Sequence, residues 1–182
     1  MKLQSKISIV RIGSGNPDFS ALVALLDQDL AVRDGDEHAF YAQFNKVDKI
    51  KHALLAFAEN QAVGCGAIRE YSEETVEVKR MFVRPEHRGQ GIAGAILSEL
   101  ETWAKELGYN RCLLETGQKQ PEAIRLYQKS GYKIIPNYGP YEGLENSVCM
   151  EKLLPSPRHL NLFHNIIQHL FRRVPLHFPL RR

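Results

Sequence analysis

The chain has 182 residues and a net charge of +3 at pH 7, from 24 basic and 21 acidic side chains. This length predicts one domain with its own hydrophobic core, and 43% hydrophobic with 25% charged residues excludes disordered, collagenous and coiled-coil chains. No apolar run approaches the roughly 18 residues of a membrane-spanning helix, which excludes such a span.

The first half of the chain predicts a strand, two helices and then three strands. Ile7–Ile12 is apolar and rich in β-branched residues, as strands are. Residues 16–18, Asn-Pro-Asp, are typical of a helix start, and apolar residues then repeat at helical spacing until residues 33–36. We expect a second short helix from about Glu37 to Lys49. The three strands, joined by tight turns and therefore antiparallel, are Ala53–Ala58, Ala62–Tyr71 and Thr75–Val83.

The second half alternates helices and strands. A helix begins after the glycines at 89, 91 and 94 and ends at Gly108. Its predicted apolar face consists of Ile92, Ile96, Leu100, Trp103 and Leu107. A strand Arg111–Thr116, a helix from Gln120 to Gly131, and the strands Tyr132–Ile135 and Ser147–Leu153 complete the chain's predicted elements. This order predicts an α/β fold with an antiparallel first half and a βαβ centre.

The segment most indicative of chemistry lies between the third predicted strand and the long helix. It carries Arg88 and three glycines, which have no Cβ and let backbone N–H groups converge on one point. Free N–H groups at a helix N-terminus bind anions, above all phosphates. A turn without a ligand is the alternative, but three glycines and an arginine exceed what a turn requires.

Two phosphate-binding interpretations compete for this segment. Gly89, Gly91 and Gly94 formally match the dinucleotide fingerprint, with Glu115 lying 21 residues beyond as the acid that would contact a ribose. We disfavour an NAD site, because charged residues separate the strand from the glycines and antiparallel strands precede it. Too little chain follows for a second nucleotide-binding half.

The second interpretation is an acyl-CoA site. Arg88–Ala93 matches Q/R-x-x-G-x-G/A and resembles the pyrophosphate loop of the GNAT superfamily of N-acetyltransferases. Residues 121–127 resemble the family's N-x-x-A-x-x-L-Y helix start, although Gln120 replaces the usual Asn, and Gly131-Tyr132 resembles the Gly-Phe that ends this helix. The resemblance covers about residues 5–154. It implies an α/β fold of GNAT type, with a mixed, mostly antiparallel central sheet flanked by helices and a βαβ acyl-CoA-binding centre.

The resemblance also implies acetyl-CoA as the acyl donor, direct attack by a primary amine in a ternary complex, and no metal. The backbone of the strand end would pair with pantetheine and the glycine segment would hold the pyrophosphate. The residues implied to bind acetyl-CoA are Met81, Phe82, Val83, Arg88, Gly89, Gln90, Gly91, Ile92, Ala93, Gly94, Gln120 and Tyr127.

Acetyl transfer to an amine needs a base and profits from an acid. An alkylamine with a pKa near 10.4 is neutral in only about one molecule in two thousand at pH 7, so a carboxylate is a useful base. By resemblance, Tyr127 would protonate the leaving thiolate, although a core tyrosine is the alternative. Glu77, as in the histone-acetylating branch, and Glu115, as in the ribosomal-protein-acetylating branch, both stay open as the base, as does a water chain. Glu77 shares a strand face with Lys79, so a solvated ion pair is its other interpretation.

The acceptor amine, on a small molecule or a protein, is less well specified. The family shapes its acceptor pocket with segments that correspond here to residues 33–44 and 137–146. The first contains Asp34, Asp36 and Glu37, which would favour a cationic amine or form a solvated loop. The second contains Tyr138 and Tyr141, which could line the pocket or form an aromatic turn.

The last 28 residues differ in composition from the rest. They carry five arginines and no acidic residue, with apolar residues at helical spacing, so we divide the chain into a GNAT-like domain, 1–154, and a basic amphipathic extension, 155–182. Three of the four histidines of the extension, His159, His164 and His169, recur every five residues, which does not assemble a metal site on a helix. Without the extension the chain is weakly acidic, so we expect no nucleic-acid partner. A homodimer stays open.

Cysteine usage and the N-terminus bear on the compartment. Cys65, Cys112 and Cys149 are widely spaced and form no CxxC pair, so neither a disulfide framework nor a zinc site is expected. The first residues lack the apolar core of a secretory signal, and we expect a cytoplasmic protein. A non-catalytic acyl-CoA-binding regulatory or interaction module is the alternative function, favoured by the basic extension, whereas Tyr127 favours an enzyme.

Overall fold

A seven-stranded sheet forms the centre of the molecule in the computed structural model, which describes residues 7–43, 47 and 50–155. The strand order is β1-β2-β3-β4-β5-β7-β6, and all neighbours are antiparallel except the parallel pair β4 and β5. The strands are β1 (Ile7–Ile12), β2 (His52–Ala58), β3 (Gln61–Ser72), β4 (Thr75–Val83), β5 (Arg111–Gly117), β6 (Lys133–Ile135) and β7 (Ser147–Leu153). The predicted fold class, mixed and mostly antiparallel with a βαβ centre, is confirmed.

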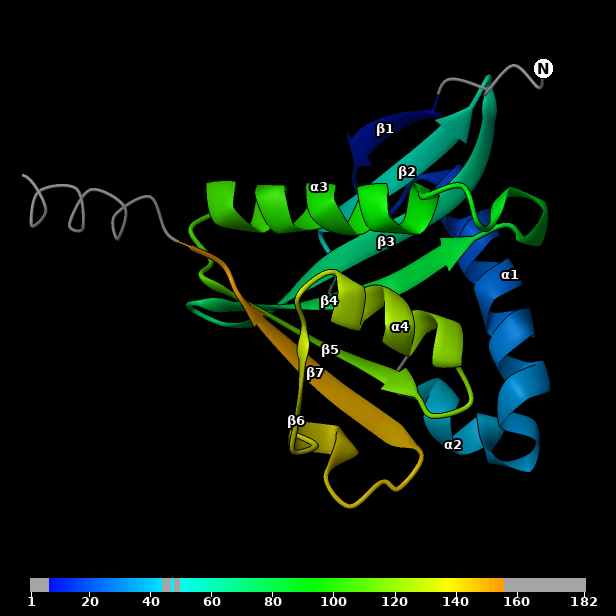
Figure 1. The fold of residues 1–182 in the computed structure, drawn as a ribbon. Coiled ribbons are helices and arrows are strands. Elements are labelled where there is room, and N and C mark those ends of the chain that lie inside the picture. The colour runs from blue at the N-terminus through cyan, green and yellow to red at the C-terminus, as the bar shows by residue number, and fades with distance from the viewer. Residues whose placement is uncertain (1–6, 44–46, 48–49, 156–182) are drawn as a thin grey trace, which may run out of the picture.

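Helices cover both faces of this sheet (Figure 1). They are α1 (Pro17–Asp34), α2 (His38–Ala42), α3 (Ile92–Glu106) and α4 (Pro121–Lys129). Helix α1 lies on one face, while α3 lies on the other face beside α4 (Figure 1). No helix in the described part of the chain is long and apolar enough to cross a membrane.

Local signals in the sequence account for the ends of the first helix. The Asn16 side chain accepts hydrogen bonds from the N–H groups of Asp18 (2.9 Å) and Phe19 (3.4 Å), and Gly35, with φ +59°, ends the helix. The second predicted helix is shorter than expected. The α-helix ends at Ala42, Gln43 lies in a 3-10 turn, and Val47 lies outside any helix, whereas residues 44–46 and 48–49 lie outside the described residues.

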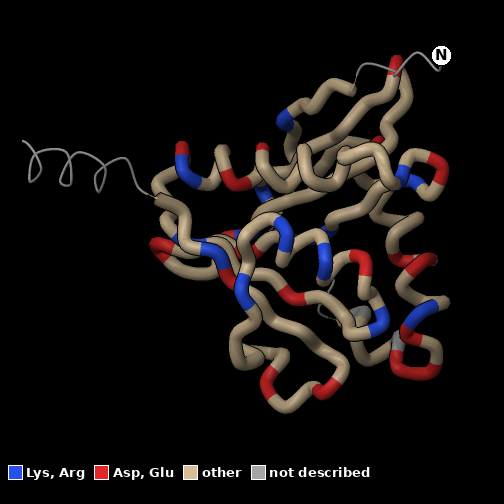
Figure 2. The backbone as a smooth tube through the Cα atoms, viewed as in Figure 1, with Lys and Arg blue, Asp and Glu red and all other residues tan. Residues whose placement is uncertain are grey.

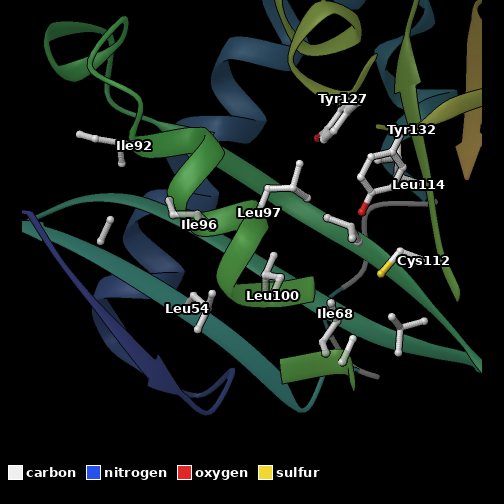
Figure 3. Packing of buried hydrophobic residues seen from close by; sticks show 14 of the residues in the cluster. Leu54, Ile68, Ile92, Ile96, Leu97, Leu100, Cys112, Leu114, Tyr127 and Tyr132 are labelled. Atoms are coloured by element: carbon white, nitrogen blue, oxygen red, sulfur yellow. The ribbon is translucent and has the colours of Figure 1, made fainter. Parts of the chain in front are cut away.

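The core is divided between the two faces of the sheet. Ile96, Leu97 and Leu100 of α3 pack with the sheet on one face (Figure 3), and Phe19, Leu22 and Leu26 of α1 pack on the other. Burial of these apolar faces stabilises the two layers against the sheet. The prediction that Leu107 belongs to the apolar face of α3 is wrong. It follows the last turn and is 42% exposed.

A bulge in β4 opens the sheet at its centre. The β3–β4 register shifts between Cys65 and Ala67, and Arg80 in the bulge has φ +58°, which is rare for a residue other than glycine. The parallel pairing of β4 with β5 extends only from Thr75↔Arg111 to Val78↔Leu114. Both strands continue beyond this point, so they diverge where their carboxyl ends carry the predicted site residues.

Candidate active site

A cavity of about 400 Å³ lies between the end of β4, the start of α3 and α4, and we call it the loop cavity. Its lining includes all residues predicted to bind acetyl-CoA except Gln90: Met81, Phe82, Val83, Arg88, Gly89, Gly91, Ile92, Ala93, Gly94, Gln120 and Tyr127. Gln90 is exposed and does not line the cavity. The end of β4, the glycine segment at the start of α3, and α4 therefore meet at one cavity.

Backbone N–H groups at the start of α3 are available to this cavity. Gly89 and Gly91 have φ of +74° and +80°, a conformation that a side chain would strain. The first hydrogen bond within α3 runs from the N–H of Ala95 to the carbonyl of Gly91 (3.0 Å). The N–H groups of residues 91–94 precede it and have no partner within the helix, so they can bind an anion.

Arg88 lies beside these amides but is held by protein groups. Its Nε donates to the carbonyl of Val83 (2.9 Å), and its Nη2 pairs with Asp29 Oδ2 (3.2 Å). The guanidinium also lies 5.6 Å from the centroid of the Phe82 ring. Arg88 therefore brings positive charge to the loop cavity while Asp29 partly offsets it.

The sequence did not predict six further residues of the loop cavity. These are Leu26, Asp29, His87, Glu122, Ala123 and Leu126. Helical spacing could have indicated Ala123, which lies one turn before Tyr127 on α4. No signal in the sequence indicates Leu26 or Asp29, because α1 reaches this cavity only through the tertiary fold.

A second cavity, of about 100 Å³, lies where β4 and β5 diverge, and we call it the split cavity. The two segments expected to shape an acceptor pocket both contribute to it. Asp34, Glu37 and Tyr41 come from the first segment, and Tyr141 and Asn146 from the second. Leu26, Met81, Gln120 and Tyr127 line both cavities. The two hollows therefore adjoin.

Tyr127 occupies the junction of the two cavities. The residue is 6% exposed and packs edge-on against Tyr132, with ring centroids 5.8 Å apart (Figure 3). Burial raises the pKa of the Tyr127 phenol, and the negative charge of Glu115 raises it further. The phenol is therefore protonated at neutral pH and can donate a proton.

Glu115 also lines the split cavity. Leu114 packs under α3, so its neighbour Glu115 faces the other side of the sheet. The Ser147 hydroxyl donates to Glu115 Oε1 (2.6 Å). Burial is the main cause that raises the pKa of the Glu115 carboxyl, whereas the Ser147 hydrogen bond and Lys79 lower it. A carboxyl with a raised pKa is a stronger base once ionised.

Glu77, the second candidate base, is enclosed instead. It is 0% exposed, lines neither cavity, and accepts hydrogen bonds from the hydroxyls of Tyr138 (3.1 Å) and Tyr141 (3.2 Å). It also forms ion pairs with Arg69 and with Lys79 (3.5 Å). The ion pair with Lys79 exists, but it is buried rather than solvated. These contacts satisfy the carboxylate and favour a structural role.

The acidic segment after α1 is partly neutralised. Acidic and basic residues lie near one another at the end of α1 and in the loop after β5 (Figure 2). Glu37 pairs with Lys119 (3.3 Å) and accepts a hydrogen bond from Asn146 (2.8 Å). Asp36 does not line the split cavity. Within the described residues, no group of three or more His, Cys, Asp and Glu side chains could hold a metal ion.

Comparisons with known proteins show the family of the chain. The profile of the acetyltransferase (GNAT) family matches residues 19–132, more than half of the chain. An IAA acetyltransferase of Azospirillum brasilense is 42% identical over 102 residues, which are 56% of this chain and 67% of that protein. An uncharacterized N-acetyltransferase of Schizosaccharomyces pombe is 28% identical over 138 residues, 72% of this chain and 85% of that protein.

Solved structures agree in fold. The structure of a Klebsiella pneumoniae protein assigned as an acyl-CoA N-acyltransferase has a TM-score of 0.70 and 33% identity, over 84% of this chain and all of that one. A GNAT-family acetyltransferase of Elizabethkingia anophelis, solved with acetyl-CoA bound, has a TM-score of 0.61 and 22% identity, over 83% of this chain and all of that one. At that identity the second likeness shows the fold alone.

Proposed function

Because the chain belongs to the GNAT acetyltransferase family, we propose that it transfers an acetyl group from acetyl-CoA to a primary amine by direct attack in a ternary complex. The observation that carries this proposal is the meeting of the loop and split cavities at Tyr127, with Glu115 on the wall of the split cavity. This arrangement offers a place for each substrate, and an acid and a base where the two substrates meet.

The loop cavity would hold acetyl-CoA. The amides of residues 91–94 and the Arg88 guanidinium offer hydrogen bonds and positive charge to the diphosphate. The end of β4, freed from β5 by the bulge, leaves the backbone of Met81–Val83 able to pair with pantetheine. A backbone N–H of the same segment could polarise the thioester carbonyl, as in an oxyanion hole.

The chemistry then needs three proton transfers before Glu115 releases its proton. Glu115, directly or through a water, takes one proton from the ammonium group of the acceptor, and the free amine attacks the thioester carbonyl carbon. The C–S bond breaks, and Tyr127 gives its phenolic proton to the departing sulfur. The excess proton on the new amide nitrogen restores the phenol. The products are the acetylated amine and CoA, with one proton released through Glu115.

Two further proposals concern the whole chain. We propose that residues 1–154 form the catalytic domain and that 155–182 are a separate extension, although only Pro155 of that segment lies within the described residues. We also propose a cytoplasmic location. It is supported by Cys65, Cys112 and Cys149, which are all buried as free thiols.

The test of the function is calorimetric titration of the full chain with acetyl-CoA, CoA and NAD. We expect micromolar binding of acetyl-CoA that Gly91→Glu abolishes, because the substitution places a side chain and a negative charge among the anion-binding amides. Gly108→Glu is the matched control. It also lies at positive φ, +95°, with no atom within 4 Å of an added Cβ, but it follows the far end of α3.

Each outcome of this titration separates the candidate functions. Binding of NAD without CoA would overturn the acyltransferase proposal. Binding of acetyl-CoA without acetylation of any amine in a broad screen would favour the non-catalytic acyl-CoA-binding module instead.

A further inference from the structure

A cluster of charged side chains lies beside the split cavity. The carboxylate of Glu77 pairs with two cations, Arg69 and Lys79, and Glu115 also acts on the charge of Lys79. Val76 and Val78 pack under α3, and Glu77 and Lys79 alternate with them on the opposite face of the sheet. Of Glu77, Arg69 and Lys79, only Lys79 lines the split cavity. The ammonium group of Lys79 therefore faces the place proposed for the acceptor.

Lys79 is unusually enclosed for a lysine. It is 7% exposed, and its ammonium group has three protons to donate. One goes to the Tyr141 hydroxyl (2.8 Å), while Glu77 Oε1 lies at 3.5 Å, beyond an ordinary hydrogen bond. Burial lowers the pKa of Lys79, while Glu77 and Glu115 raise it and Arg69 lowers it. A further anion in the cavity would compensate this desolvated charge.

Negative charge also lies on the wall of the same cavity, where Glu115 stabilises the charged form of Lys79. Glu115 and Asp34 line it, as does Glu37, whose charge is offset by Lys119. The lining carries both signs of charge. Arg80 pairs with Asp27 and Lys119 with Glu37, so Lys79 and Glu115 are the two poles that a ligand can meet. A polycationic acceptor would be repelled by Lys79. A small zwitterion would place its ammonium group near Glu115 and its carboxylate on Lys79, so that both poles are paired.

The size of the cavity agrees with a small acceptor. The part beside Lys79 and Glu115 has a volume of about 100 Å³, well below the 300–1,000 Å³ of pockets for drug-sized ligands, and a further hollow of about 290 Å³ adjoins it at Glu37, Tyr41 and Asn146. Resting on the proposed function, we propose that the acceptor is a free amino acid, and that Lys79 binds its carboxylate while Glu115 faces its amine. A lysine side chain within a protein has no carboxylate at this distance from its amine and would fit less well.

The first test compares substrates on the unaltered full chain. Free amino acids, their carboxamides and the matching decarboxylated amines are assayed as acceptors at saturating acetyl-CoA. We expect kcat/KM to be at least tenfold higher for the free acids, which corresponds to about 1.4 kcal/mol. Equal or better acetylation of the amides, the amines or a lysine-containing peptide would overturn this inference and leave the proposed function intact.

The second test uses Lys79→Met, with Lys133→Met on the exposed part of edge strand β6 as the matched control. Lys79→Met should raise KM for the acids at least tenfold more than KM for the amides, and the control should change neither. If Lys79→Met affects the acids and the amides equally, Lys79 has a structural role only, and the inference is overturned. If acetyl-CoA does not bind, or binds while no acceptor of any class is acetylated, the proposed function fails and this inference fails with it.

Discussion

The loop cavity and the split cavity are built in different ways. Most of the loop cavity comes from two short stretches of chain, residues 81–94 and 120–127, and its anion-binding groups are backbone amides. The split cavity collects side chains from α1, α2, β4, β5 and the loop before β7. A binding site made of backbone can keep its ligand while side chains change, whereas a site made of dispersed side chains can change its ligand without altering the fold.

Under the proposed function, the two cavities hold different substrates. The backbone of the loop cavity would hold the donor, whose diphosphate is always the same. The split cavity would select the acceptor, through charges such as Lys79 and Glu115. Substitutions that affect one cavity and spare the other therefore test whether the division is real.

The largest effect is expected at Tyr127, which belongs to both cavities. Tyr127→Phe removes the proposed acid but retains the ring, so kcat should fall about 10²- to 10³-fold with little change in acetyl-CoA affinity. Single-turnover kinetics and calorimetry measure the two quantities. Tyr132→Phe is the matched control, because that ring packs against Tyr127 but lines neither cavity. Equal losses in both variants would contradict a catalytic role for the phenol.

The next effect distinguishes the two carboxylates. Glu115→Gln should lower kcat about 10²-fold and remove the acidic limb of the pH–rate profile, because the base must be ionised to accept a proton. Glu77→Gln should retain that limb, since Glu77 lines neither cavity. A profile that loses its acidic limb in Glu77→Gln but not in Glu115→Gln would reverse the assignment.

The same pair of variants should differ in stability. Burial raises the pKa of Glu115, so the folded state binds its proton more tightly than the unfolded state, and stability falls as pH rises through the raised pKa. Glu115→Gln should therefore raise Tm at pH 8. Glu77→Gln should lower the free energy of unfolding by about 3 kcal/mol, because Arg69 and Lys79 lose their shared counter-ion. Thermal and chemical unfolding measure these changes.

The contrast between the cavities also explains how much the sequence could predict. The order of strands and helices follows local periodicity and caps, and the glycine segment is contiguous, so both were predictable. Which of Glu77 and Glu115 lines a cavity was not predictable, because it depends on where β4 and β5 separate. That point is set by the bulge at Arg80, a non-glycine residue at positive φ that no local pattern indicates.

Residues from α1 show the same limit. Asp29 has no motif around it, yet it lines the loop cavity and pairs with Arg88 (3.2 Å). Arg33, one turn later on α1, lies 3.5 Å from the other carboxylate oxygen of Asp29 and pairs with Glu122 of α4 (2.6 Å). This chain of ion pairs crosses from α1 to α4 beside the cavity and exists only in the folded protein.

The smallest effect is expected at Asp29, where the negative charge lies close to the proposed diphosphate site. Asp29→Asn should release Arg88 for the ligand and remove a repulsive charge, which tightens acetyl-CoA binding about three-fold at low salt, in the range of partly exposed ion pairs. The gain should shrink as salt screens the interaction. Asp18→Asn, at the opposite end of α1, is the matched control.

Whether Asp29→Asn strengthens or weakens acetyl-CoA binding shows how the loop cavity is organised. Tighter binding in Asp29→Asn, measured by calorimetry at two salt concentrations, would mean that the carboxylate competes with the diphosphate for Arg88. Weaker binding would mean that Asp29 positions Arg88, so that the loop cavity depends on a dispersed side chain as the split cavity does. In that case backbone alone would not define the donor site, and the division between the two cavities would hold only for the amides of residues 91–94.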